Sequence, residues 1–252
     1  QNNTLSRPGF SLSGTALKRI ACLSMLLDHI GASLLENGLF KQGSFWPGDV
    51  QLDGVLRLAG RLAFPIFAFF LAEGFRLTHS RKRYLQRLVL FALLAELPFD
   101  RMTGKQWVDW SGQNVLWTLA LGLCAMACVQ RAPREPGLPS LAWLSAAAGC
   151  CLLGELLNTD YGAFGVLLCL LFYCTHGLRR RFWICGGMFL WMCYAFQFVF
   201  LPGIPVPLEA LGILSFPLLA VYRGRRSSRR PLGRYGFYWF YPLHMLLLAL
   251  FS

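Results

Sequence analysis

Nine runs of apolar residues divide the chain, and each is about long enough to cross a lipid bilayer as a helix. A helix rises about 1.5 Å per residue, so roughly 17 to 25 apolar residues cover roughly 30 Å of hydrocarbon. Hydrophobic residues make up 56% of the 252 and charged residues only 14%, more apolar surface than one soluble core can bury. The runs are 17–36, 54–77, 84–99, 114–130, 138–157, 162–178, 182–201, 208–222 and 235–251. We therefore expect an all-α fold, a polytopic helical bundle of about nine transmembrane helices in a single domain, 1–252.

Basic residues lie in the short segments between these runs, mostly on one side of the expected bundle. With the N-terminus in the cytoplasm, 19 of the 24 basic residues fall in cytoplasmic segments or at their helix ends. Lys and Arg resist translocation, so the pattern predicts a multi-pass protein of the bacterial cytoplasmic (inner) membrane with that orientation. The net charge of +12 is therefore explained by the basic residues of the cytoplasmic segments. We expect membrane lipids and no nucleic acid as partners. The segment 223–234 carries six arginines, which either attract anionic lipid or bind a phosphorylated cytoplasmic donor.

Ionisable and polar side chains gather at one level, in the outer half of the expected bundle. Asp28 and His29 lie late in the first helix, which runs outward, while Arg57 and Arg61 lie early in the second, which returns. Other polar residues stand at similar depth near the ends of later helices: Glu96, Gln113, Asn114, Glu155, Asn158, Asp160 and Tyr161. Such groups are costly inside a bilayer, so each needs a partner, an aqueous cavity or a function.

The spacing of four of these residues adds detail. Lys18 and His29 are eleven residues apart, about three turns or roughly 16 Å on one helix face, so the pair joins the cytoplasmic surface to the buried level. Arg57 and Arg61 share a face, and Pro65 lacks the N–H that the carbonyl of Arg61 would otherwise accept. A polar backbone group is therefore expected to be free beside an arginine.

Structural alternatives stay open for several of these residues. Asp28 either forms a structural ion pair with an arginine or orients His29, and Glu96 is a second candidate for fixing the His29 tautomer. His244 is either a second polar site or a core histidine.

Two further patterns concern ion pairing and metals. Glu73 and Arg76, three residues apart, are expected to form an intrahelical pair. No metal is expected, because the four histidines lack ligand spacing, and the nine cysteines, which form no CxxC, are expected to act as small buried hydrophobes.

Several motifs in one order resemble the TraX family of membrane proteins, named after a conjugative pilin acetylase, over most of the chain. They are KRIACLSMLLDHIG (18–31), LAGRLAFPIFAFFLAEGF (58–75), RKRYLQRLVLFALLAELPFD (81–100), QNVLWTLALGL (113–123), NTDYGAFGVLL (158–168) and FYPLHMLLL (240–248). The family is similar in turn to a wider superfamily of transmembrane acyltransferases, whose first helix carries a basic residue, ten intervening residues and a histidine. Lys18 and His29 fit that spacing.

The resemblance implies transfer of an acetyl or other short acyl group from cytoplasmic acetyl-CoA to an unknown hydroxyl or amine acceptor. On that basis His29 is expected to be a general base oriented by Asp28, with Arg57 or Arg61 stabilising the oxyanion. The remaining candidates divide between donor and acceptor. We assign Lys18, Arg19, Asn114 and His244 to the acyl-CoA site, and Glu96, Asp160 and Tyr161 to the acceptor site.

Two other classes of function compete with this hypothesis. A proton-coupled transporter or carrier would use the same Asp, His and Arg residues as a relay. The runs show no two-fold repeat, and the ionisable residues cluster at one depth, which disfavours it. A structural or partner-binding membrane protein would need them only as pairs between helices.

Overall fold

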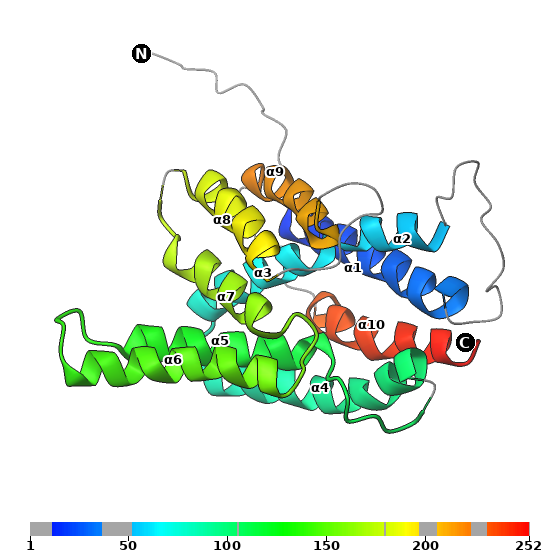
Figure 1. Ribbon diagram of the computed structural model, residues 1–252, viewed down its shortest axis with the longest axis horizontal. Coiled ribbons are helices and arrows are strands. Elements are labelled where there is room, and N and C mark those ends of the chain that lie inside the picture. Colours follow the sequence, from blue (N-terminus) through cyan, green and yellow to red (C-terminus); the bar gives the residue numbers. More distant parts are fainter. Residues whose placement is uncertain are drawn as a thin grey trace, which may run out of the picture.

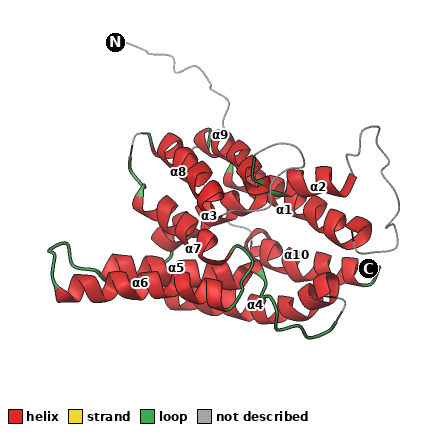
Figure 2. Ribbon diagram, viewed as in Figure 1, coloured by secondary structure: helices red, strands yellow, loops and turns green. Residues whose placement is uncertain are grey.

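The computed structural model describes residues 12–36, 52–104, 106–178, 180–196, 206–222 and 231–251, and these are helical, without a β-strand (Figure 2). The elements are α1 (Gly14–Ile30), η1 (Gly31–Glu36), α2 (Leu52–Gly60), α3 (Ala63–Leu77), α4 (Arg81–Gly104), α5 (Val115–Arg131), α6 (Leu138–Leu156), α7 (Gly162–Cys174), α8 (Arg181–Ala195), η2 (Leu208–Leu214), α9 (Ser215–Ala220) and α10 (Pro231–Ala249). The predicted all-α class is confirmed for this part of the chain. Most of the arginine-rich segment 223–234 lies outside the described residues.

The apolar runs became helices with boundaries close to those predicted, but three runs are divided. The run 17–36 forms α1 followed by one π-helical segment, η1. The run 54–77 breaks at Arg61 and Leu62 into α2 and α3, where Pro65 removes the helical donor for the Arg61 carbonyl. Ser24 of α1 stabilises the break, since its hydroxyl donates to the carbonyls of Ala59 (2.5 Å) and Gly60 (3.1 Å). The run 208–222 forms a 3-10 helix, η2, followed by the short α9.

The helices pack in two groups (Figure 1). Helices α4, α5 and α6 lie side by side, with α10 against α4, and α1, α2, α8 and α9 lie across the molecule from them. Helix α7 joins the groups, because it contacts α5 and α6 on one side and α3 on the other. The core between them is rich in aromatic side chains, and Phe69, Phe75, Phe164, Phe172 and Phe189 are almost fully buried.

A single glycine sets how closely α1 approaches α2. A Cβ atom added at Gly60 would stand 2.3 Å from Cβ of Asp28, closer than side chains can lie. Only glycine therefore permits the approach that brings Asp28 next to the break at Arg61.

The outer surface of several helices is apolar. Large hydrophobic side chains are exposed along α4, α6, α8 and α10, and examples are Leu93, Leu141, Trp183, Trp191 and Leu247. Two helical stretches of the described chain, 54–77 and Leu138–Leu156, are long and apolar enough to cross a membrane. Helix α5, helix α7 and the stretch Leu208–Ala220 are apolar but shorter. The count of about nine spans stays a prediction.

Candidate functional site

A cavity of about 160 Å³ lies between α1, α3, α4, α5 and α10. Both residues of the basic and histidine pair of α1 line it, Lys18 near the start of the helix and His29 in its last turn. Asp28, Asp160 and Tyr161 supply further polar lining, and the remaining walls are mainly aromatic and aliphatic. The cavity thus follows α1 for about three turns, from a cation at one end to an imidazole at the other.

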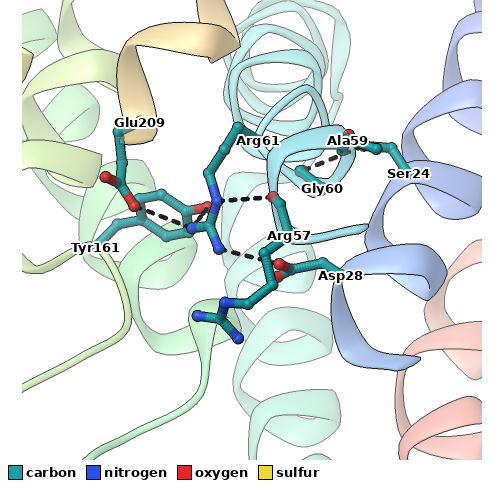
Figure 3. A network of polar contacts seen from close by, with 8 residues as sticks. All are labelled: Ser24, Asp28, Arg57, Ala59, Gly60, Arg61, Tyr161 and Glu209. Carbon is teal, nitrogen blue, oxygen red and sulfur yellow. Dashed lines mark hydrogen bonds and ion pairs between the residues drawn. The ribbon is translucent and has the colours of Figure 1, made fainter. Parts of the chain in front are cut away.

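Arg61 holds the polar cluster beside the His29 end of the cavity together (Figure 3). Its guanidinium donates to Oδ1 of Asp28 at 2.9 Å and to Oε1 of Glu209 at 3.0 Å, and Arg61 is only 8% exposed. Its Nε donates to the carbonyl of Arg57 at 3.1 Å, and Nη1 lies 3.5 Å from the hydroxyl of Tyr161. The buried cation is therefore neutralised by two carboxylates, as a charge in an apolar interior requires. Neither Arg57 nor Arg61 lines the cavity.

His29 contacts a second histidine. Its Nδ1 lies 2.6 Å from Nε2 of His244 in α10, and Nδ1 of His244 lies 2.6 Å from the carbonyl oxygen of Phe240. His244 is 6% exposed and does not line the cavity, so it lies behind His29. The sequence placed His244 in the acyl-CoA site, and the structure brings it to the imidazole instead.

Lys18 is partly buried among aromatic rings. Its Nζ lies 5.0 Å from the centre of the Phe70 ring and 5.6 Å from that of Phe237, distances at which a cation is attracted to the ring faces. Arg19, the next residue, is exposed and does not line the cavity. The two cations thus stand at one end of the cavity, one inside and one outside.

Glu96 and Asn114 form a separate polar cluster that does not line the cavity. Nδ2 of Asn114 donates to Oε2 of Glu96 (2.5 Å) and to the carbonyl of Ala92 (2.9 Å), and Nε1 of Trp117 donates to the same carboxylate (2.8 Å). Asn114 also caps α5, because its Oδ1 accepts from the backbone N–H of Leu116 at 3.1 Å. Every polar atom of this buried amide is engaged within the protein.

Asp160 and Tyr161 lie in the connection between α6 and α7, and both face the cavity. The connection is held to the start of α5, because Asp160 N–H donates to the Gln113 carbonyl at 2.8 Å and the Thr118 hydroxyl donates to the Asp160 carbonyl. Tyr161 has a left-handed backbone (φ 68°), which costs a non-glycine residue energy and is common at functional sites. Its ring stacks on Phe64 with centres 3.9 Å apart.

A second space borders Tyr161. It has a volume of about 210 Å³, and Glu155, Asn158 and Thr159 give it a polar lining. Tyr161 and Phe164 belong to its wall as well, and Tyr161 also lines the main cavity. One tyrosine therefore separates two spaces.

Glu209 is the site residue that the sequence analysis missed. It is the acidic residue near the start of the run 208–222, at the same expected depth as the other ionisable groups. That position could have identified Glu209 from the sequence, because a lone carboxylate in an apolar run needs a partner. The partner, Arg61, is 148 residues away in the chain.

Glu73 pairs across helices rather than along its own. Its Oε1 accepts from Nη1 of Arg181 at 3.4 Å and lies 3.8 Å from Nε2 of His176. The predicted intrahelical pair with Arg76 is wrong, because the start of α8 brings Arg181 to this carboxylate.

The comparison with known proteins agrees with the motifs. The profile of the family described as "TraX protein" matches residues 13–252. A probable fimbrial assembly protein FimC, serogroup H1, of Dichelobacter nodosus is 30% identical over 250 residues, which span 94% of each chain. No solved structure matches the chain significantly. With the profile covering nearly the whole sequence, the chain belongs to the TraX family.

Proposed function

We propose that the chain is a membrane-embedded acyltransferase that moves an acetyl or other short acyl group from coenzyme A to a hydroxyl or amine acceptor. The observation that carries the proposal is the single cavity lined by both Lys18 and His29. A cation at one end suits the phosphates of a donor, and an imidazole at the other end suits proton transfer. The relative from Dichelobacter is named a probable fimbrial assembly protein, so a fimbrial subunit is one acceptor that fits.

The surface supports a membrane location. Leucine and tryptophan side chains are exposed along four helices, and a soluble protein rarely shows that much contiguous apolar area. Lipid tails would cover these faces, with α1 placing its N-terminal end in the cytoplasm of a bacterial inner membrane. The Lys18 end of the cavity then lies toward the cytoplasm, where acetyl-CoA is made available.

The donor would bind with its phosphates at the Lys18 end. Lys18 lines the cavity and exposed Arg19 stands beside it, so both cations are available to phosphate oxygens. The pantetheine arm is thin and largely apolar, which matches the aromatic walls between Lys18 and His29. The roughly 16 Å between the two residues is a span that an extended arm can cover.

The transfer itself needs one general base. The acceptor hydroxyl or amine would lose its proton to His29 as its oxygen or nitrogen attacks the thioester carbon. The carbon–sulfur bond then breaks, and the thiolate of coenzyme A takes the proton back from the imidazole. Atoms and charge balance, because acceptor and thiol exchange the acyl group and one hydrogen.

Tyr161 is the lining residue best suited to stabilise the oxyanion. Its hydroxyl accepts from Nη1 of Arg61, which leaves its own O–H free to donate into the cavity. Arg57 and Arg61, the residues first considered for this role, do not line the cavity. We therefore assign the direct contact to Tyr161 and a supporting role to Arg61. The space on the other side of Tyr161 is then the approach for the acceptor.

The test is transfer of label by a His29→Ala variant. Envelopes from cells that express each variant are incubated with radiolabelled acetyl-CoA, and label in acid-insoluble material is counted. Positioned proton transfer contributes about 10²–10⁴-fold, so His29→Ala should lower the rate by that factor while the purified protein still binds acetyl-CoA. His176→Ala is the matched control, because His176 lies in a turn outside the cavity.

Two results would count against the proposal. Transfer by His29→Ala at the wild-type rate removes the imidazole from the mechanism. If calorimetry shows that the purified wild-type protein binds neither acetyl-CoA nor coenzyme A, then coenzyme A is not the acyl donor.

A further inference from the structure

We propose that His244 is a positioning residue that fixes the tautomer of His29, so that Nε2 of His29 carries the lone pair that takes the proton. The inference rests on the proposed function, because it explains how His29 would serve as a base. It concerns proton positions, however, and these can be measured without any turnover.

The chain of hydrogen bonds begins at a group that can only accept. The carbonyl oxygen of Phe240 lies 2.6 Å from Nδ1 of His244. A carbonyl has no hydrogen to donate, so Nδ1 of His244 must carry the proton. A neutral imidazole has a single N–H, and Nε2 of His244 is therefore an acceptor.

The second bond passes this constraint to His29. Its Nδ1 lies 2.6 Å from Nε2 of His244, so Nδ1 of His29 must donate. The two rings are within 5° of parallel, with centres 4.9 Å apart. The separation of the centres equals the nitrogen–nitrogen distance plus the distance from each of these nitrogens to its own ring centre. The two centres and the two nitrogens therefore lie on one line, and the parallel rings share one plane. An N–H···N bond along a lone pair requires this arrangement. The rings are not stacked face to face.

The surroundings favour a neutral pair. The one carboxylate next to His29 in the chain, Asp28, is bound to Arg61 at 2.9 Å. The other carboxylate in the cavity is Asp160, and the facing ring on α10 is Tyr241, with its centre 6.3 Å from that of His29. A cation shared by two imidazoles would stand close to Arg57 and Arg61 in an apolar interior, which is unfavourable.

The residues that the sequence suggested for orienting His29 are occupied elsewhere. Asp28 binds Arg61, and Glu96 receives the donors of Asn114 and Trp117. Neither carboxylate has a hydrogen bond or ion pair with His29 among the described residues. His244 takes this role instead, from a helix 215 residues away in the chain.

The remaining nitrogen of His29 is the basic one. With its proton at Nδ1, neutral His29 keeps the lone pair at Nε2. Four side-chain atoms of the described chain are buried without a hydrogen-bond partner, and Nε2 of His29 is not one of them. After Nε2 accepts a proton, Nδ1–H still donates to His244, which stabilises the imidazolium. His244 cannot pass that proton onward, because its Nδ1–H already faces a carbonyl. The pair therefore fixes and supports the base, and it does not conduct protons.

Nitrogen-15 NMR of histidine-labelled protein in nanodiscs tests the proton positions. The two tautomers of a neutral imidazole give different nitrogen shifts, and His29 is identified by its absence in a His29→Gln sample. Wild-type protein, with no donor or acceptor added, should show His29 protonated at Nδ1. In His244→Leu, which removes the acceptor, His29 should shift toward the Nε2-protonated form that isolated histidine favours.

Kinetics with radiolabelled acetyl-CoA provide the second readout. A wrong tautomer of a catalytic histidine costs up to about 10⁴ in rate, and we expect His244→Leu to lower kcat at least about 10²-fold with little change in KM for acetyl-CoA. His244→Gln can place an amide oxygen near the lost Nε2 and should recover about tenfold or more of that loss. Leu243→Ala is the control, since this neighbour in α10 is exposed and outside the site.

The possible outcomes separate this inference from the proposed function. His29 protonated at Nε2 in the wild type, or unaltered by His244→Leu, overturns the inference even if transfer occurs. The expected tautomer in a protein that transfers no acyl group supports the inference about His244 and overturns the acyltransferase. Should His244→Leu fail to fold, the wild-type spectrum alone decides.

Discussion

The described part of the chain holds two polar clusters, and only one of them lines the main cavity. The first contains Asp28, His29 and Arg61, and the second contains Glu96 and Asn114. The sequence placed both at one depth and assigned both to a site. In the structure the first lines a cavity through Asp28 and His29, while the second lines neither of the two spaces described above, and its buried amide, Asn114, is fully hydrogen-bonded within the protein.

The difference shows what distinguishes a candidate site from structural polarity. Asn114 uses its amide to cap α5 and to hold α4, so no atom remains for a ligand. His29 uses one ring nitrogen within the protein and keeps the other available. Arg61 lies between the two extremes, because it is bonded to carboxylates yet contacts the cavity residue Tyr161.

The largest effect on stability should come from Arg61→Met. The substitution leaves Asp28 and Glu209 buried without their cation, and an uncompensated buried charge costs about 3–5 kcal/mol. The midpoint of thermal unfolding in detergent should fall by roughly 6–20 °C. A maleimide dye can report it, because Cys22, Cys169 and Cys193 are buried free thiols in the folded protein.

A triple variant controls for the loss of charge balance. Arg61→Met combined with Asp28→Asn and Glu209→Gln removes the cation and both anions, and it should recover most of the lost midpoint. If the single variant is as stable as the wild type, Arg61 is not the centre of this cluster. If the triple variant is no more stable than the single one, the loss comes from packing and not from charge.

Tyr161→Phe should affect activity and leave stability nearly unchanged. The variant keeps the ring stacked on Phe64 and removes only the hydroxyl that faces Arg61 and the cavity. Loss of one oxyanion donor costs about 10²–10³ in kcat, which label transfer from acetyl-CoA measures. A rate within twofold of the wild type would remove Tyr161 from the oxyanion role.

The helices could be read from the sequence because their signal is local. The run 138–157 corresponds to α6, Leu138–Leu156, whereas the run 54–77 was expected as one helix and is divided at Arg61, four residues before Pro65. Hydrophobic length is enough to define an element such as α6.

The partners could not be read in this way, because tertiary packing selects them. Glu209 meets Arg61 across 148 residues, and His244 meets His29 across 215. The sequence gives the expected depth of a charged residue, but several helix arrangements place a different carboxylate at that depth. The same limit explains why Glu73 binds Arg181 and not its close neighbour Arg76.

Asn114→Ala should have the smallest effect, and one on stability alone. It removes the cap of α5 and two donors from the Glu96 cluster, which together cost about 1–3 kcal/mol, or roughly 2–12 °C in the unfolding midpoint. Asn114→Ser keeps an acceptor for the cap and should lose less. Because no atom of Asn114 faces the cavity, the KM for acetyl-CoA and the kcat per folded molecule should stay near the wild-type values. A tenfold rise in KM at unchanged stability would make Asn114 part of the donor site and remove the distinction between the two clusters.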